Sequence, residues 1–318
     1  MSLFSSFLHQ VLAAMPLFML IALGWLLVRW RNWPETITTA LNRVVFRLAL
    51  PAMLFRLMCD FSAGPAVDVR LLLAFFGGCL LVFIFGRLIA SRVFKFDGVA
   101  GSVFALGGIF SNNVLLGIPV AKVMIGDQAM PSVALVLVFN GLLLWTLATA
   151  SVEWYRHGSL SVKGIGKTTA SVLRNPLIIG ILSGTAFSFS GLTLPTIIDR
   201  PLTMIGQIAV PLALIALGMS LAVYRIRDGL AISYTLSAIK LVVMPLVVWA
   251  LAALLGLPPL ESKVVVLLAS MSVGVNVYLM SQQFQALTGP AAASMLITTV
   301  FSAITTPVLI LTMDGVYG

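Results

Sequence analysis

Residues 98–125 read GVAGSVFALGGIFSNNVLLGIPVAKVMI, an apolar stretch that is interrupted in its middle by Ser111-Asn112-Asn113. It is long enough to cross a bilayer, which takes about 20 apolar residues in a helix. Glycines, adjacent amides and a proline favour local unwinding, and backbone groups freed inside a membrane must line a cavity or meet another polar segment. Residues 262–285 contain a similar interruption, Ser272-Val-Gly-Val-Asn276. The sequence therefore predicts two broken membrane helices whose breaks meet.

The composition of the whole chain agrees with a membrane protein. Of its 318 residues, 60% are hydrophobic and 9% are charged, whereas a soluble domain carries about 25% charged residues. Open sheet edges cannot be satisfied in lipid, and the alternating pattern of a β-barrel is absent. We therefore predict an all-α integral membrane protein whose main solvent is the lipid bilayer.

Charges, prolines and glycines divide the chain into ten predicted transmembrane spans. The first half, residues 1–153, holds five spans and the second half, residues 171–318, holds five more; residues 154–170 form a linker rich in Gly, Ser and Lys. The predicted spans are 7–28, 36–59, 69–90, 98–125, 130–153, 171–190, 201–223, 229–255, 262–285 and 289–313.

Basic residues gather in the loops that follow the odd-numbered spans, and both tails lack Lys and Arg. By the positive-inside rule, this places the linker in the cytoplasm and both termini outside it, in a multi-pass plasma membrane protein such as one of the bacterial inner membrane. We attribute the net charge of +9 to these cytoplasmic loops and not to binding of a nucleic acid. With five spans in each half, the second half is predicted to be inverted relative to the first.

The two halves also share landmarks. Pro51 and Pro211 occupy the second span of each half, and Asn112 and Asn276 occupy the fourth, at offsets of 160 and 164 residues. Inverted repeats with interrupted helices are typical of secondary transporters, whose substrate sites lie near the midplane at the breaks.

The polar residues of both breaks are the candidate substrate-binding residues: Ser111, Asn112, Asn113, Ser272 and Asn276. The helix N-termini at such breaks suit an anionic group. The alternative is that these small polar residues only hold neighbouring helices together.

Two basic residues, Arg47 and Lys240, lie near the midpoints of their spans, while every acid lies at or near a span end or in a loop. A charge at this depth is a functional-site candidate, and cations without a nearby carboxylate suggest an anionic substrate. We include both residues in the predicted site. The alternative is that they pair with carbonyls freed beside Pro51 and Pro245; Arg43, nearer a span end, is expected to snorkel to the surface.

No catalytic motif is present, and the two cysteines lack the spacing of a metal site or a disulfide framework. We expect a carrier, not an enzyme, with no cofactor and no metal. A sodium-coupled symporter is the alternative within transport, weakened because the broken spans offer no buried carboxylate for a hard cation. A membrane-embedded enzyme and a sensor or structural protein are alternatives from other classes.

The segment Ser111-Asn112-Asn113-Val-Leu-Leu-Gly117-Ile-Pro119 resembles the fourth-helix motif of the auxin efflux carrier family, which includes plant PIN-type carriers and bacterial malonate-type permeases. Further matches are Leu50-Pro51-Ala-Met-Leu, Lys240-Leu-Val-Val-Met-Pro245 and Val275-Asn276-Val.

The resemblance implies a fold like that of bile-acid symporters and transport of a small organic anion, a carboxylate such as malonate or an auxin-like acid. Spans 1, 2, 6 and 7 would form a scaffold, often a homodimer interface, and spans 3–5 and 8–10 a transport domain that moves as an elevator. Asn112 and Asn276 would hold the substrate. This sequence departs from the family where prolines often mark the crossing: it has Ser111 and, in the ninth span, Ser272 or Val273.

Overall fold

The computed structural model describes residues 3–63, 67–157, 174–223 and 229–317. Within these ranges the chain is helical, and the only extended pairing is a single antiparallel bridge between Ser111 and Val273. The predicted all-α class is confirmed.

The helices of the first half are α1 (Leu3–Arg29), α2 (Glu35–Val44), η1 (Val45–Ala49), α3 (Leu50–Met58), η2 (Phe61–Ala63), α4 (Arg70–Arg92), α5 (Gly98–Ile109), η3 (Asn113–Gly117), α6 (Ile118–Met124), η4 (Asp127–Ala129) and α7 (Met130–His157). Those of the second half are α9 (Pro176–Phe189), α10 (Thr196–Val223), α11 (Leu230–Ala238), η5 (Ile239–Val243), α12 (Met244–Leu254), α13 (Pro259–Ser270), α14 (Val275–Phe284) and α15 (Thr288–Tyr317).

Six continuous helical segments in the described ranges are long and apolar enough to cross a membrane: 35–58, 70–92, 127–156, 196–222, 230–254 and 288–317. Four apolar helices are shorter: 15–29, 98–109, 113–124 and 176–189. Every predicted span coincides with one helix or with two or three consecutive helices, wherever the structure describes it. The chain is thus a multi-pass membrane protein, while ten crossings and an inverted symmetry stay predictions.

Helix α7 continues past the predicted end of the fifth span. The span is predicted to end at Glu153, and α7 continues to His157 because no helix-breaking residue separates Trp154-Tyr155-Arg156 from the span. The rest of the predicted linker, residues 158–170, lies outside the described residues.

Three of the helices contain a widened π turn, and each of these turns ends two residues before a proline. The turns are η1, η5 and η3, and the prolines are Pro51, Pro245 and Pro119. Proline lacks an N–H and its ring clashes with the carbonyl four residues earlier, so the preceding turn cannot keep regular α-helical hydrogen bonds. Arg47 and Lys240 both lie in such turns.

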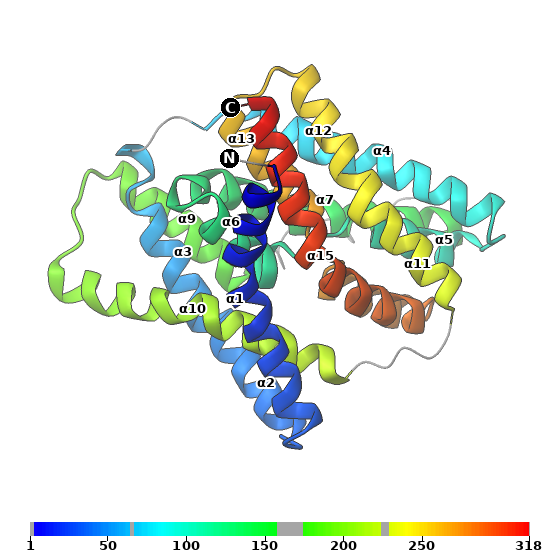
Figure 1. Cartoon of the computed structure of the whole chain (residues 1–318), viewed down its shortest axis with the longest axis horizontal. Coiled ribbons are helices and arrows are strands. Elements are labelled where there is room, and N and C mark those ends of the chain that lie inside the picture. Colours follow the sequence, from blue (N-terminus) through cyan, green and yellow to red (C-terminus); the bar gives the residue numbers. More distant parts are fainter. Residues whose placement is uncertain (1–2, 64–66, 158–173, 224–228, 318) are drawn as a thin grey trace.

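The helices pack in two groups. The first comprises α1, α2–η1–α3, α9 and α10, with α1 crossing α10 and α3 lying along α9 (Figure 1). Glycines permit the close α1–α10 crossing: a Cβ on Gly24 would collide with the carbonyl of Ile215, and one on Gly218 with the carbonyl of Ile21.

The second group comprises α4 to α7 and α11 to α15, in which α4 packs against α5 and α12, and α11 against α15. The groups touch chiefly where α15 and α6 meet α1 and where η3 meets α10. The broken segments lie inside the second group, and nearly every residue of α5 and α13 is buried.

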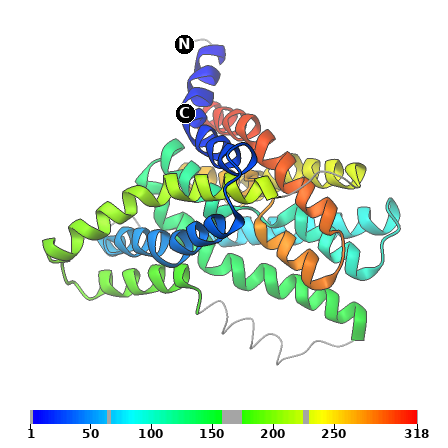
Figure 2. The same ribbon diagram turned by 90° about the horizontal axis from the view of Figure 1, so that it is seen from below.

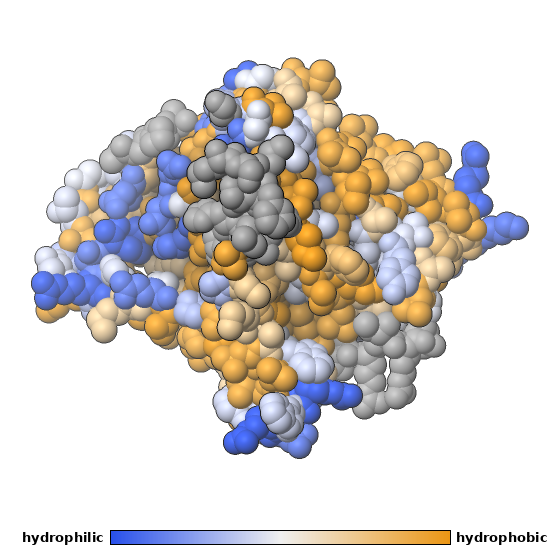
Figure 3. Space-filling model, viewed as in Figure 1, coloured by the Kyte–Doolittle hydropathy of each residue, from blue (hydrophilic) through white to orange (hydrophobic). Residues whose placement is uncertain are grey.

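The outer surface suits lipid. Val242 on η5 and Leu246 and Leu254 on α12 are exposed apolar side chains. Much of the face seen in Figure 3 is hydrophobic, and hydrophilic side chains gather toward the ends of the molecule. The start of α1 and the end of α15 lie near each other in both views (Figures 1 and 2).

Candidate functional site

The two breaks cross directly. The chain leaves α5 at Ile109 and resumes helical structure at Asn113; it leaves α13 at Ser270 and resumes at Val275. Between them, the Asn112 N–H donates to the Ser272 carbonyl at 2.8 Å, and the Gly274 N–H donates to the Phe110 carbonyl at 2.8 Å. The predicted meeting of the two breaks is therefore confirmed, and its form is a short antiparallel pairing around Ser111 and Val273.

Gly274 permits the close approach of the two breaks. A Cβ at this position would lie 3.0 Å from the Ser111 carbonyl oxygen, tighter than an ordinary contact. A side chain here would push the two segments apart.

Two helices start at the crossing, η3–α6 from Asn113 and α14 from Val275. The first N–H groups of a helix have no partner within the helix, and the N-terminus carries a partial positive charge of about half an electron. The crossing therefore places two weakly electropositive helix ends in the interior of the second group.

Polar side-chain atoms without partners gather at the same place. Ser111 Oγ, Asn112 Nδ2, Asn113 Nδ2, Asn113 Oδ1 and Ser272 Oγ are all buried and make no hydrogen bond to any residue that the structure describes. Such groups normally cost free energy, about 1–3 kcal/mol each, unless something bonds to them. They provide both donors and acceptors for a polar ligand at the crossing.

Asn276, the remaining amide of the predicted set, lies in the first turn of α14 and is only partly buried. Three of the five predicted polar residues, Ser111, Asn112 and Ser272, thus lie in the buried pairing itself, and Asn113 and Asn276 lie at the starts of the helices that follow it.

Lys240 is fully buried, and its Nζ donates to the Ala269 carbonyl at 2.5 Å, in the last turn of α13. In the described part of the chain no acid forms an ion pair with it. The Lys240 side chain thus binds the backbone next to the second break, where its protonated form adds positive charge.

Arg47 lies elsewhere. It is exposed on η1 in the first helix group. Arg43, one turn earlier on α2, is exposed as well. The structure therefore brings Lys240 to the crossing and leaves Arg47 apart from it.

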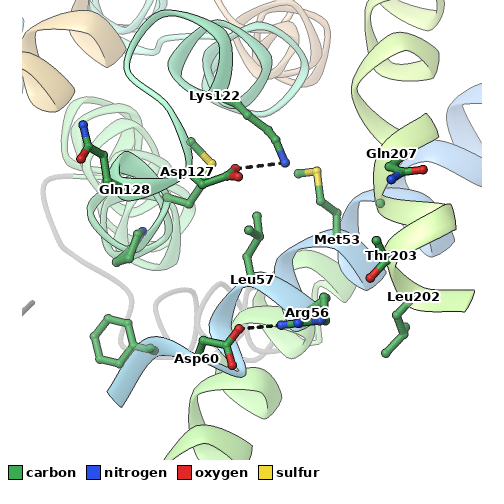
Figure 4. Close-up of a pocket in the computed structure, with 14 residues that line it drawn as sticks. Met53, Arg56, Leu57, Asp60, Lys122, Asp127, Gln128, Leu202, Thr203 and Gln207 are labelled. Carbon is green, nitrogen blue, oxygen red and sulfur yellow. Dashed lines mark hydrogen bonds and ion pairs between the residues drawn. The ribbon is translucent and has the colours of Figure 1, made fainter. Parts of the chain in front are cut away.

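A cavity of about 520 Å³ separates the two helix groups. Its walls come from α3 and α10 on one side and from α6, η4 and α7 on the other (Figure 4). On one wall Arg56 pairs with Asp60 at 2.7 Å, and it also pairs with Asp199, which does not line the cavity; on the other wall Lys122 pairs with Asp127 at 3.1 Å. Lys122 lies on the helix that starts at Asn113, so this wall is connected directly to the crossing.

Thr298 on α15 was not among the predicted site residues. Its Oγ1 accepts a hydrogen bond from the Val273 N–H at 2.9 Å, within the second break. A hydroxyl in the middle of the tenth span was the available signal, but Thr298-Thr299 offers two adjacent hydroxyls, and the sequence does not say which of them faces the break.

A family model for membrane transport proteins matches residues 9–310. The chain belongs to this family. It is the auxin efflux carrier family that the fourth-span motif suggested.

The relatives are named as transporters. The chain is 28% identical over 297 residues to a protein of Rhizobium meliloti named "Putative malonate transporter", covering 92% of each. It is 27% identical over 266 residues to an uncharacterised transporter of Methanocaldococcus jannaschii, covering 82% of this chain and 85% of the relative. The transporter YfdV of Escherichia coli, also uncharacterised, is 22% identical over 301 residues, 93% of this chain and 95% of the relative. As a member of this family, the protein is a membrane transporter and not an enzyme.

Proposed function

We propose that this family member is a secondary transporter of a small organic anion, a carboxylate such as malonate. The observation that carries the proposal is the cluster of unpartnered buried atoms on Ser111, Asn112, Asn113 and Ser272. A carboxylate has two oxygens that accept hydrogen bonds, which matches the amide and hydroxyl donors of this cluster. Asn276 completes the proposed set from the first turn of α14.

The charge around the crossing favours an anion. Lys240 is buried beside the second break, and two helix N-termini begin at the crossing. Since a charge in a low-dielectric interior interacts more strongly than in water, these groups together favour a negatively charged ligand. Arg47, exposed on η1, is left outside the proposed site.

The packing suggests how the substrate moves. The crossing lies entirely within the second helix group, and the 520 Å³ cavity lies between that group and the first. We propose that the second group is the transport domain and carries the crossing past a scaffold of α1, α2–η1–α3, α9 and α10, in an elevator motion. In this proposal the ten transmembrane spans form two inverted repeats, and two copies of the protein form a homodimer through their scaffold helices.

Uptake into proteoliposomes tests the substrate class. The purified protein is reconstituted and given radiolabelled malonate, then malonamate and malonamide, in which one or both carboxylates become neutral amides. We expect saturable malonate uptake and little or no uptake of malonamide, because the amide lacks the charge that Lys240 and the helix ends favour. Uptake of malonamide or of a small cation at the rate of malonate would contradict an anion carrier.

A further inference from the structure

One peptide unit in the second break is held from both sides. The carbonyl of Ser272 accepts from the Asn112 N–H at 2.8 Å, and the N–H of Val273 donates to Thr298 Oγ1 at 2.9 Å. The C=O and N–H of a trans peptide lie in one plane and point in opposite directions. The Ser272–Val273 peptide is therefore fixed between α15 on one side and the first break on the other.

The hydroxyl of Thr298 is oriented for this role. Its side chain is fully buried, and its proton is donated to the Ser294 carbonyl of the same helix at 2.6 Å. A hydroxyl has one proton and two acceptor lone pairs. With the proton used inside α15, the oxygen acts as the acceptor for the Val273 N–H.

We propose that Thr298 is a positioning residue of the transport site. It fixes the Ser272–Val273 peptide, and through the Ser272 carbonyl it fixes the backbone of Asn112. It does not touch the substrate. The proposal rests on the proposed function for its transport consequences, but its structural consequence can be measured without any substrate.

The neighbouring residue provides a matched control. Thr299 is also buried, and its Oγ1 donates to the Met295 carbonyl at 2.7 Å, a bond confined to α15. Replacing either threonine by valine keeps the β-branched shape and removes the hydroxyl. Only the Thr298→Val change leaves the Val273 N–H without its acceptor.

Hydrogen–deuterium exchange of the solubilised protein tests the structural step. We expect the peptide that covers residues 271–274 to exchange faster in Thr298→Val than in the wild type, with no change in Thr299→Val and protection restored in Thr298→Ser. Equal exchange in Thr298→Val and Thr299→Val would overturn the proposal, because the hydroxyl would then not hold the break.

Malonate affinity tests the functional step. We expect Thr298→Val to raise the apparent KM about tenfold, the scale of one lost buried hydrogen bond, with a smaller change in kcat. Thr298→Ser and Thr299→Val should keep the wild-type KM. An unchanged KM together with faster exchange would overturn the positioning role. If the wild type transports no carboxylate while the exchange pattern holds, the proposed function fails and the structural role of Thr298 stands.

Discussion

Nζ of Lys240 lies 2.5 Å from the carbonyl oxygen of Ala269, at the point where α13 ends. The neighbouring carbonyls of that turn are bonded locally: Leu267 accepts from the Ser270 hydroxyl at 2.8 Å, and Leu268 accepts from the Met271 N–H at 3.4 Å. The last carbonyls of a helix have no partner within it, and a cation at this end is favourable. Lys240 thus supplies both a hydrogen bond and a charge that the broken helix lacks.

Replacing Lys240 by methionine should lower malonate transport by at least about tenfold, because the buried Ala269 carbonyl loses its donor and the site loses its charge. Lys240→Arg keeps the charge and should retain part of the activity. The measurement is initial uptake into proteoliposomes, corrected for the amount of folded protein.

The same variants separate two roles for Lys240. If its ammonium acts through the backbone of α13, the residual uptake of Lys240→Met should still discriminate malonate from malonamide. Loss of that discrimination would assign Lys240 to direct contact with the carboxylate instead.

Replacing Gly218 by valine should destabilise the first helix group. A side chain there collides with the Ile21 carbonyl across the α1–α10 crossing, so the helices must move apart. Overpacking of this kind costs about 1–3 kcal/mol, and we expect a lower midpoint of thermal unfolding in detergent. Gly315→Ala on α15 is the control, since a Cβ there meets nothing within 4 Å; equal midpoints for the two variants would contradict close packing at this crossing.

Both termini are predicted to lie outside the cytoplasm. Basic residues gather in the loops that follow the odd-numbered spans, whereas both tails lack Lys and Arg. Alkaline phosphatase fused after Gly318 should be active, and a fusion after Lys95 should be inactive. The reverse pattern would overturn the predicted orientation, and equal activity of the two fusions would remove the basis for ten spans and an inverted second half.

The meeting of the two breaks was predictable because polar groups inside apolar spans must line a cavity or bond to other polar segments of the protein. Ser111, Asn112, Asn113 and Ser272 were found for that reason. The sequence pattern did not predict the position of Arg47 relative to the crossing. The depth of a residue in the membrane follows from its position along a helix, but the direction of its side chain depends on how the helix packs. The roles of Thr298 and of the Ala269 carbonyl depend on contacts between helices that are far apart in the sequence, so no local sequence pattern indicates them.

Asn112 offers the sharpest test of the site, because its backbone and its side chain have separate tasks. The backbone N–H donates to the Ser272 carbonyl, and the Asn112 carbonyl accepts from Leu116 and Gly117 at 3.2 and 3.0 Å, while the side-chain Nδ2 has no partner among the described residues. Asn112→Ala keeps these backbone bonds and removes a buried polar group that is unsatisfied in the protein. We therefore expect uptake to fall by at least about tenfold while the unfolding midpoint stays equal or rises, the trade between activity and stability that substrate-binding residues show.

Asn42 on α2 is the matched control, since its Nδ2 donates to Ser220 Oγ at 3.0 Å within the first helix group. Asn42→Ala should lose about 1 kcal/mol of stability and keep the uptake rate of each folded molecule. We thus expect opposite outcomes for the two variants. Asn112→Ala should lose activity and keep its stability, and Asn42→Ala should lose stability and keep its activity. Near-normal uptake by Asn112→Ala would make this residue part of the helix packing and would move the substrate site away from the crossing.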